Sequence, residues 1–256
     1  MTLVKLGGSL ITDKSRLRTF RGDRMGILAQ EIRKAGAGMI LVHGAGSFGH
    51  ILAKEHKLKD GYINEKQIPG ISQVQRDVRS LNLMVLDALL KEGLKPVSLP
   101  PSSIVRLNDG ALDAFDVRPF HEYLGLGLMP VTFGDVVLDS EKKFAICSGD
   151  DLMLWLSKEF KPERAVFATD TDGVYPNYPP AEDERIIEKL DWETLKTIGG
   201  ATDRADVTGG IVRKLTLMFD IADVEVETWV INGSADGRLM KFLMGHTVPG
   251  TQIMRR

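Results

Sequence analysis

The chain has 256 residues with 43% hydrophobic content, so it can bury the core of one large α/β domain or of two lobes that share a sheet. A formal net charge of -2 gives no basic surface of the kind that binds nucleic acid, so we expect a small-molecule partner and no nucleic acid. We expect a cytoplasmic protein without export or membrane association, because the one cysteine, Cys147, has no disulfide or metal-binding partner and no run is apolar over a membrane-spanning length.

The first part of the chain is predicted to alternate strands and helices. Apolar runs favour strands at 3–6, 39–42 and 95–99. A helix is expected over 23–36, and a longer one over 71–93, where apolar residues recur at three- and four-residue spacings. This order of elements is typical of repeated βα units.

A local antiparallel arrangement is predicted next. Short apolar runs at 130–133, 136–138 and 144–147 indicate strands, and the polar turn 139–142 joins the last two as a hairpin. The alternation of strand and helix is therefore interrupted at this point.

The last part of the chain returns to that alternation. We expect a boundary between two lobes, 1–147 and 148–256, near Ser148, where the hairpin region ends. Repeated βα units predict a mostly parallel sheet that helices cover. The predicted elements are a helix over 150–159, a strand over 165–168, helices near Asp191 and Gly210, a strand over 226–231 and a final short helix.

A glycine-rich run from His43 to His50 follows the second predicted strand and includes Gly44, Gly46 and Gly49. Without a Cβ, these glycines allow φ > 0 and a close approach of the backbone to a ligand, so successive N–H groups can point into one concavity. A helix that begins near His50 would add the positive end of its dipole, and the imidazole would add a further donor. The run therefore predicts an anion site.

The same run also matches the dinucleotide-binding pattern G-x-G-x-x-G. A dinucleotide fold places an acidic residue at the end of the next strand, about 20 residues on. In this chain that region holds Gln67-Ile68-Pro69-Gly70 and leads into a helix. The chain also lacks the G-x-x-x-x-G-K-[ST] loop and the His-Arg-Asp motif of protein kinases, so a phosphate site must be built differently.

Two lysines near the first strand are candidates for binding phosphate. Lys5 precedes Gly7 and Gly8, and Lys14 lies in the basic loop that follows. An isolated lysine at either position is usually solvated. The adjoining glycine pair favours an anion contact for both.

Carboxylates and glycines in the second half extend this pattern. Asp150 and Asp151 begin a predicted helix; we expect Asp151 to cap the helix and Asp150 to orient the lysines. Asp170 begins a run that ends in Tyr175 at the carboxyl end of a strand, where open sheets bind ligands, although a tight Asp-Gly turn also accounts for it.

A last glycine pair lies at the start of a predicted helix. Gly209 and Gly210 are followed by Lys214, one turn inside that helix. By position alone Lys214 would be an exposed helix lysine. The glycine pair favours a contact with phosphate.

Five segments, in this order, resemble the amino acid kinase family over nearly the whole chain. They are the runs 5–9, 43–50, 148–152, 169–175 and 207–214. Their order is more specific than any single glycine run. A glycine run that ends in histidine is similar to that of members acting on isopentenyl phosphate or fosfomycin, whereas the acetylglutamate and carbamate kinases lack this histidine.

The resemblance implies a three-layer αβα sandwich with a mostly parallel central sheet. Residues 1–147 are expected to bind the phosphoryl acceptor and residues 148–256 to bind ATP. The implied cofactors are ATP and Mg²⁺, with Mg²⁺ held mainly by phosphates and by no side chain. A homodimer is also implied.

The resemblance also assigns roles to individual residues. The residues expected to be catalytic are Lys5, Lys14, His50, Asp150 and Lys214. The expected ATP contacts are Lys5, Gly7, Gly8, Gly46, Asp170, Tyr175, Gly209 and Lys214. The expected contacts with the acceptor are Gly44, Ala45, Gly46, Gly49, His50 and Gly149.

The expected reaction is ATP-dependent phosphorylation of isopentenyl phosphate to isopentenyl diphosphate, a step of isoprenoid biosynthesis. The acceptor is already anionic, so His50 is expected to donate a hydrogen bond and not to abstract a proton. A fosfomycin-type kinase and a non-catalytic protein that binds a nucleotide or oxyanion are the alternatives. The candidates for an apolar tail pocket, for which core packing is the competing interpretation, are Ile71, Val74, Val78, Phe133 and Ile146.

Overall fold

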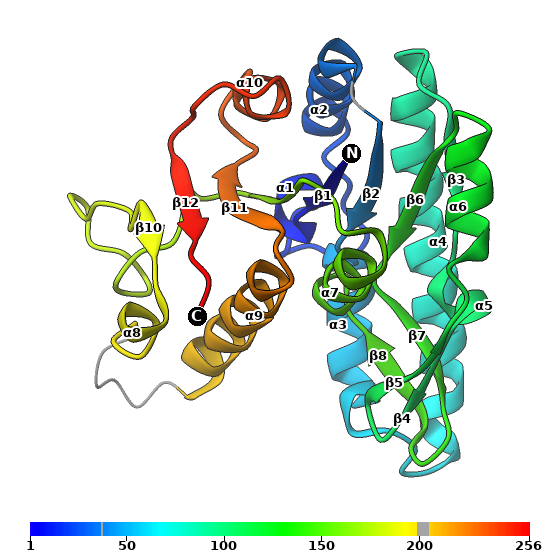
Figure 1. The fold of residues 1–256 in the computed structure, drawn as a ribbon. Helices are drawn as coiled ribbons and strands as arrows, with labels where there is room; N and C mark the ends of the chain where they lie inside the picture. Colours follow the sequence, from blue (N-terminus) through cyan, green and yellow to red (C-terminus); the bar gives the residue numbers. More distant parts are fainter. Residues whose placement is uncertain (37, 199–204) are drawn as a thin grey trace.

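The computed structural model describes residues 1–36, 38–198 and 205–256, with the backbone alone over 205–209. Within them, eight strands form a central sheet in the order β10-β12-β11-β9-β1-β2-β6-β3 (Figure 1). These strands are β1 (Thr2–Leu6), β2 (Met39–His43), β3 (Pro96–Ser98), β6 (Met129–Phe133), β9 (Arg164–Thr169), β10 (Lys189–Leu190), β11 (Glu227–Asn232) and β12 (Gly250–Ile253).

Strand β1 joins the two halves of the chain at the centre of this sheet. It pairs in parallel with β2, where Lys5 is opposite Val42, and with β9, where Lys5 is opposite Phe167. Parallel pairing continues outward to β6 and β11, whereas β12 is antiparallel to β11. The carboxyl ends of β1, β2, β6, β9 and β11 therefore meet at one edge, where parallel sheets bind ligands.

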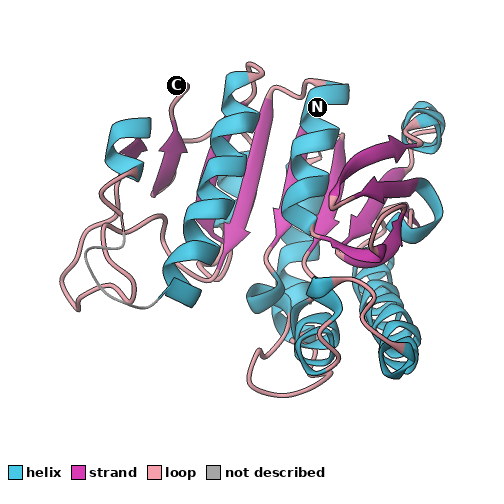
Figure 2. Ribbon diagram, turned by 90° about the horizontal axis from the view of Figure 1, so that it is seen from below, coloured by secondary structure: helices cyan, strands magenta, loops and turns pink. Residues whose placement is uncertain are grey.

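Helices cover both faces of the central sheet (Figures 1 and 2). Alternate residues of β1 face opposite layers, since Val4 and Leu6 belong to one core and Leu3 to the other. The structure is thus the predicted three-layer αβα sandwich. One layer contains α2 (Gly22–Ala35), α4 (Ile68–Lys91) and α10 (Arg238–Leu243), and the other contains α6 (Arg118–Gly125), α7 (Gly149–Phe160), α8 (Trp192–Leu195) and α9 (Ala205–Asp223).

Local sequence signals set the ends of these helices. Helix α2 ends at Ala35 and is capped by Gly36, which has φ of 64° and donates its N–H to the carbonyl of Ile32. Helix α7 follows Ser148, whose hydroxyl accepts the N–H of Asp151 at 3.2 Å while the Asp151 carboxylate accepts the N–H of Ser148. Ser148 is therefore the N-cap of α7, and Asp151, the residue expected to cap the helix, completes the capping box from the first turn.

A second sheet of four strands lies at the carboxyl end of β6 (Figure 1). It contains the predicted antiparallel hairpin of β7 and β8. Val136 and Phe144 of this hairpin pack against Leu52 and Val74 of the helices behind it. The strand order is β5-β4-β7-β8, with β4 (Val105–Asn108), β5 (Ala111–Phe115), β7 (Asp135–Asp139) and β8 (Lys143–Cys147).

Several elements differ from the prediction. Helix α3 (Gly46–Glu55) begins at Gly46 and not near His50, because the Thr12 hydroxyl accepts the Ser47 N–H and so caps this helix from another segment. Helix α9 begins at Ala205, earlier than predicted, so Gly209 and Gly210 lie in its second turn and not at its start. The unpredicted elements are α1 (Gly8–Ile11), β4, β5, α5 (Pro101–Ile104), α6, β10 and β12.

Candidate active site

Two glycine segments, Gly7–Gly8 after β1 and Gly44–Gly46 after β2, are in contact at the carboxyl ends of these strands. A Cβ added to Gly8 would lie 2.7 Å from the Gly46 Cα atom, and one added to Gly44 would lie 2.7 Å from the Gly8 nitrogen. Gly46 also has φ of 49°. A side chain at any of these positions would push the two segments apart, so their contact requires glycine.

The start of α3 presents unpaired backbone donors beside this contact. The N–H groups of Ala45 and Gly46 have no acceptor among the residues that the structure describes. The following N–H, of Ser47, donates to the Thr12 hydroxyl at 3.0 Å, and that hydroxyl donates to the Gly8 carbonyl at 2.7 Å. Two available N–H groups at the positive end of a helix are a favourable site for an anion.

Lys5 and Asp150 form a buried ion pair between β1 and the start of α7. The Lys5 Nζ atom lies 2.9 Å from Asp150 Oδ1, and the two side chains are only 12% and 11% exposed. Among the described residues, Oδ1 has no well-aligned hydrogen-bond donor, so its contact with Lys5 is an ion pair of poor hydrogen-bond geometry. Burial raises the pKa of Asp150, but the charges of Lys5 and Lys214 outweigh it and lower that pKa overall.

Gly149 leaves space for the Lys5 side chain. A Cβ on Gly149 would lie 3.1 Å from the Lys5 Cε atom. Lys5 points to this layer because it alternates along β1 with the inward-facing Val4 and Leu6 of the other core. The lysine is therefore held in position by the sheet pleat, by Gly149 and by Asp150.

His50 lies in the second turn of α3, where the residue as a whole is exposed. Its imidazole nevertheless loses hydration, which lowers its pKa; the charges of Lys214, Lys14 and Lys5 lower that pKa further, and Asp150 opposes them. Charges act on a titrating group with such effect only at short range. The five residues predicted as catalytic are therefore near enough for the charges of the other four to act on the His50 imidazole.

Lys214 reaches the same cluster from α9. The surrounding protein lowers its pKa by desolvation, although the residue as a whole is exposed. Asp150 raises the pKa of Lys214, whereas Lys5 and Lys14 lower it. The mutual effects of these lysines indicate a cluster with excess positive charge, which suits a phosphate ligand.

The C-terminal half of the sheet contributes Asp170 at the end of β9. Its carboxylate accepts a hydrogen bond from the Ser9 hydroxyl at 2.9 Å. Gly7 donates its N–H to the Ala168 carbonyl at 2.8 Å, so the first glycine segment is fastened to β9. Tyr175 lies further along the loop after β9, and the surroundings of Gly209 lie outside the described residues.

Three polar residues that hold the glycine segments were not predicted. Ser9 links the first segment to Asp170, Thr12 links it to α3, and the buried His43 contacts the Gly44 carbonyl. The signals in the sequence were weak: two hydroxyls within one helical turn of Gly8, and one polar side chain at the end of an apolar run.

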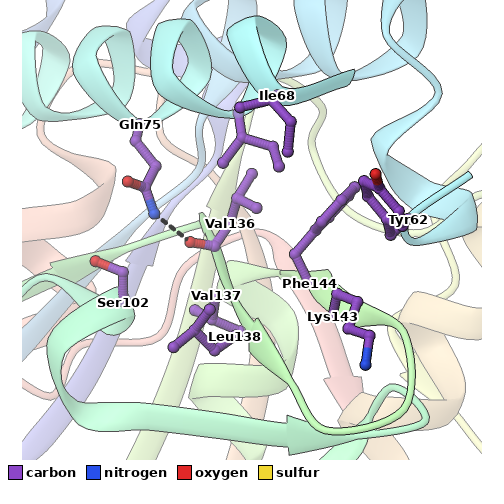
Figure 3. Close-up of a pocket in the computed structure, with 10 residues that line it drawn as sticks. Tyr62, Ile68, Gln75, Ser102, Val136, Val137, Leu138, Lys143 and Phe144 are labelled. Atoms are coloured by element: carbon purple, nitrogen blue, oxygen red, sulfur yellow. Dashed lines mark hydrogen bonds between the residues drawn. The ribbon is translucent and has the colours of Figure 1, made fainter. Parts of the chain in front are cut away.

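An apolar cavity of about 510 Å³ lies between α4 and the β7–β8 hairpin (Figure 3). Ile68, Ile71 and Phe144 are among its apolar lining residues, and Tyr62 and Lys143 lie at one end in Figure 3. The side chain of Gln75 donates to the Val136 carbonyl at 2.8 Å across this space. The cavity can hold an apolar group, with polar atoms at its margins.

The candidates for a tail pocket fall into different environments. Ile71 lines the cavity, and Ile146 is 37% exposed on the same face of β8 as Phe144. Val74, Val78 and Phe133 are buried in the core that α3, α4 and the hairpin share. Core packing therefore accounts for the last three.

Side chains in the described ranges form no group of three or more potential metal ligands. In the same ranges, no helix is both long and apolar enough to cross a membrane.

Comparison with known proteins gives consistent matches. The model of the amino acid kinase family matches residues 1–232. The isopentenyl phosphate kinase of Methanothermobacter thermautotrophicus is 38% identical, with 99% of this chain and 98% of that protein covered. The isopentenyl phosphate kinase of Thermoplasma acidophilum is 37% identical over 93% of this chain and 94% of that protein. A solved structure of an isopentenyl phosphate kinase has a TM-score of 0.87 at 35% identity and covers 99% of this chain and 100% of the other.

Proposed function

This chain belongs to the amino acid kinase family, and on that basis we propose that it transfers the γ-phosphoryl group of ATP to isopentenyl phosphate. The products are isopentenyl diphosphate and ADP. Relatives that match over nearly the full chain support this acceptor. The observation that carries the chemistry is the cluster of Lys5, Lys14, Lys214 and Asp150 around His50, beside the contact of the two glycine segments.

Phosphoryl transfer spreads negative charge over the moving group, so it depends on cations and positioning more than on covalent chemistry. Lys5 and Lys214 reach the cluster from β1 and α9, and in this proposal they neutralise the β- and γ-phosphates of ATP. Asp150 holds Lys5 through the ion pair at 2.9 Å. Lys14 supports the acceptor side.

The acceptor site is proposed at the start of α3. The unpaired N–H groups of Ala45 and Gly46 would bind the phosphate of isopentenyl phosphate, and His50 would donate to it from the next turn. An oxygen of this phosphate attacks the γ-phosphorus while the bond from that phosphorus to the β,γ-bridging oxygen breaks. The attacking oxygen carries no proton, so the reaction needs no general base.

The nucleotide is proposed to pass beside the glycine contact. Added Cβ atoms at Gly7 and Gly8 would lie 3.1 Å from the Ala168 oxygen and 2.7 Å from Gly46 atoms, so the backbone of both residues packs closely on β9 and the start of α3, and in this proposal the triphosphate follows that backbone. Asp170 and Tyr175 would border the adenosine. Mg²⁺ bound through the phosphates would supply further positive charge to the transferring group.

The apolar cavity supports an isoprenoid tail. It lies beside α4 and the hairpin, and its lining includes Ile71, a residue predicted for this role. A polar acceptor such as fosfomycin would gain little from such a surface. The cavity therefore favours isopentenyl phosphate over the fosfomycin alternative.

We propose that the two halves of the chain, which each contribute strands to the central sheet, bind different substrates. Residues 1–147 would hold the acceptor and 148–256 the nucleotide, with the two sites facing each other across β1.

We also propose a homodimer, supported by Leu83 and Leu90, which are 60% and 55% exposed and lie two turns apart on α4. Sedimentation velocity tests this state. The buried Cys147 supports a cytoplasmic location.

An acceptor screen tests the proposed function. Purified protein is supplied with ATP, Mg²⁺ and, in separate reactions, isopentenyl phosphate, dimethylallyl phosphate, fosfomycin or acetylglutamate, and ADP release is measured. Isopentenyl phosphate should support the fastest release, with a diphosphate product seen by ³¹P NMR. ADP release with fosfomycin alone would establish the alternative kinase, and ATP binding without turnover of any acceptor would indicate a non-catalytic protein.

A further inference from the structure

A buried chain of hydrogen bonds leads from β3 through α4 to the glycine run. The Ser98 hydroxyl donates to Asn82 Oδ1 at 2.6 Å, Asn82 Nδ2 lies 3.1 Å from His43 Nε2, and His43 Nδ1 lies 3.1 Å from the Gly44 carbonyl oxygen. His43 is fully buried and Asn82 is 2% exposed. The function proposed above assigns no role to these side chains.

The partners fix the donor and acceptor at each position. The Gly44 carbonyl can only accept, so His43 Nδ1 carries the hydrogen. His43 Nε2 is then the acceptor for the Asn82 amide, whose oxygen accepts from Ser98. The imidazole also stacks on Phe133, with ring centroids 5.2 Å apart and an angle of 17° between the planes.

The carbonyl that His43 holds belongs to the peptide between Gly44 and Ala45. In a trans peptide the C=O and N–H bonds point in opposite directions. A carbonyl drawn into the core toward His43 therefore turns the Ala45 N–H away from the core. This N–H has no acceptor among the described residues.

We infer that His43, Asn82 and Ser98 are positioning residues, which fix the Gly44–Ala45 peptide so that the Ala45 N–H faces the acceptor phosphate. The inference rests on the proposed phosphate site at the start of α3. It predicts that breaking these hydrogen bonds harms acceptor use and leaves ATP use intact, because among the described residues the three side chains form no hydrogen bond with the lysine cluster or with β9.

Three variants test this role. His43→Phe keeps an aromatic ring on Phe133 but loses both hydrogen bonds, whereas His43→Gln can still donate to Gly44 and accept from Asn82. Ser98→Ala is a mild variant that removes only the outermost bond. Thr132→Val is the matched control, since the buried Thr132 hydroxyl donates to the Leu99 carbonyl at 2.8 Å and does not reach the glycine run.

Steady-state kinetics give the first measurement. His43→Phe should raise the KM for isopentenyl phosphate about tenfold or more, the effect of weakening one hydrogen bond to a charged group, with the KM for ATP changed less than twofold. His43→Gln should recover most of the loss, Ser98→Ala should show a smaller loss of the same kind, and Thr132→Val should show none. Equal losses for both substrates, or no rescue by glutamine, would overturn the inference.

The Ala45 amide gives a second measurement that does not need turnover. In ¹⁵N-labelled protein, inorganic phosphate should shift the Ala45 resonance in the native chain and in His43→Gln, and much less in His43→Phe. An equal shift in His43→Phe contradicts the positioning role. If the native protein binds phosphate at Ala45 but does not phosphorylate isopentenyl phosphate, the proposed substrate is wrong while the positioning role stands.

Discussion

His50 lies on α3, and the charges of three lysines from other segments, Lys5, Lys14 and Lys214, act on its imidazole. The chemistry of His50 follows from that surrounding charge. Desolvation, Lys214, Lys14 and Lys5 lower its pKa, so the free protein holds a neutral imidazole at pH 7. A neutral ring has one N–H donor, which is sufficient for a hydrogen bond to phosphate. A bound phosphate would offset the lysine charges and strengthen this donor.

His50→Ala should therefore abolish most turnover without disturbing the nucleotide. We expect kcat/KM for isopentenyl phosphate to fall on the order of 100-fold, the usual effect of removing one donor to a developing charge. The dissociation constant for ATP, measured by calorimetry, should change less than twofold. A large loss of ATP affinity would contradict the role of His50 on the acceptor side.

A second histidine connects pH to stability. Burial lowers the pKa of His43 from 6.5 to about 4, and its hydrogen bond to Gly44 opposes this effect only partly. The folded state therefore favours the neutral ring. Its contribution to stability is complete above pH 6.5 and is lost as the pH falls toward 4.

Urea unfolding at pH 7 and pH 4.5 measures this loss. The free energy of unfolding of the native chain should fall by about 2 kcal/mol more than that of His43→Gln over this interval, as the shift in pKa requires. Other groups that titrate in the same range affect both proteins and cancel. Equal losses in the two proteins would show that His43 does not titrate differently on unfolding.

At the level of secondary structure elements, the contact between α1 and α3 predicts the effect of a substitution at Gly8. Gly8→Ala places a Cβ 2.7 Å from backbone atoms of Gly46, so it should displace the start of α3. We expect a loss of about 1–3 kcal/mol in stability from overpacking, together with a large fall in kcat. Thermal unfolding and the acceptor assay measure both.

Gly26→Ala is the control for this substitution. Gly26 lies inside α2, and no atom lies within 4 Å of an added Cβ. Because alanine favours a helix over glycine, stability should rise by about 0.5–1 kcal/mol with activity unchanged. A loss of activity in Gly26→Ala would mean that the assay responds to substitutions remote from the site.

Sequence patterns predicted the buried elements better than the exposed ones. Apolar runs such as 39–42 and the stripe along α4 predicted their strand and helix because burial imposes the pattern. Strand β5 was missed because its residues are mostly exposed, so no alternation of apolar and polar residues marks it. The start of α3 was misplaced because Thr12, a residue of another segment, caps it.

The candidate site was predictable where a side chain needed glycines beside it. Lys5 and Lys214 were selected as candidates through the adjoining glycine pairs, and Gly209 and Gly210 lie inside α9. Ser9 and His43 were missed because their roles depend on partners far along the chain, Asp170 and Asn82. Sequence spacing alone does not contain such contacts.

The continuous sheet predicts how the whole molecule unfolds. Because β1 pairs with β9 as well as with β2, the four strands from each half of the chain join into one continuous sheet. Calorimetry should show one cooperative transition. Isopentenyl phosphate and a non-hydrolysable ATP analogue, each at a hundredfold excess over its Kd, should each stabilise that same transition by about 2.7 kcal/mol. Two transitions, with each ligand affecting a different one, would contradict this.

The central position of β1 also constrains how the chain folds during its synthesis. Thr2 pairs with Met39, which emerges from the ribosome early, but its other neighbour, Arg164, emerges much later. Until then one side of β1 is an open strand edge, with unpaired N–H and C=O groups that other chains can bind. The strand that carries Lys5 thus presents an open edge through which nascent chains can aggregate until Arg164 has emerged.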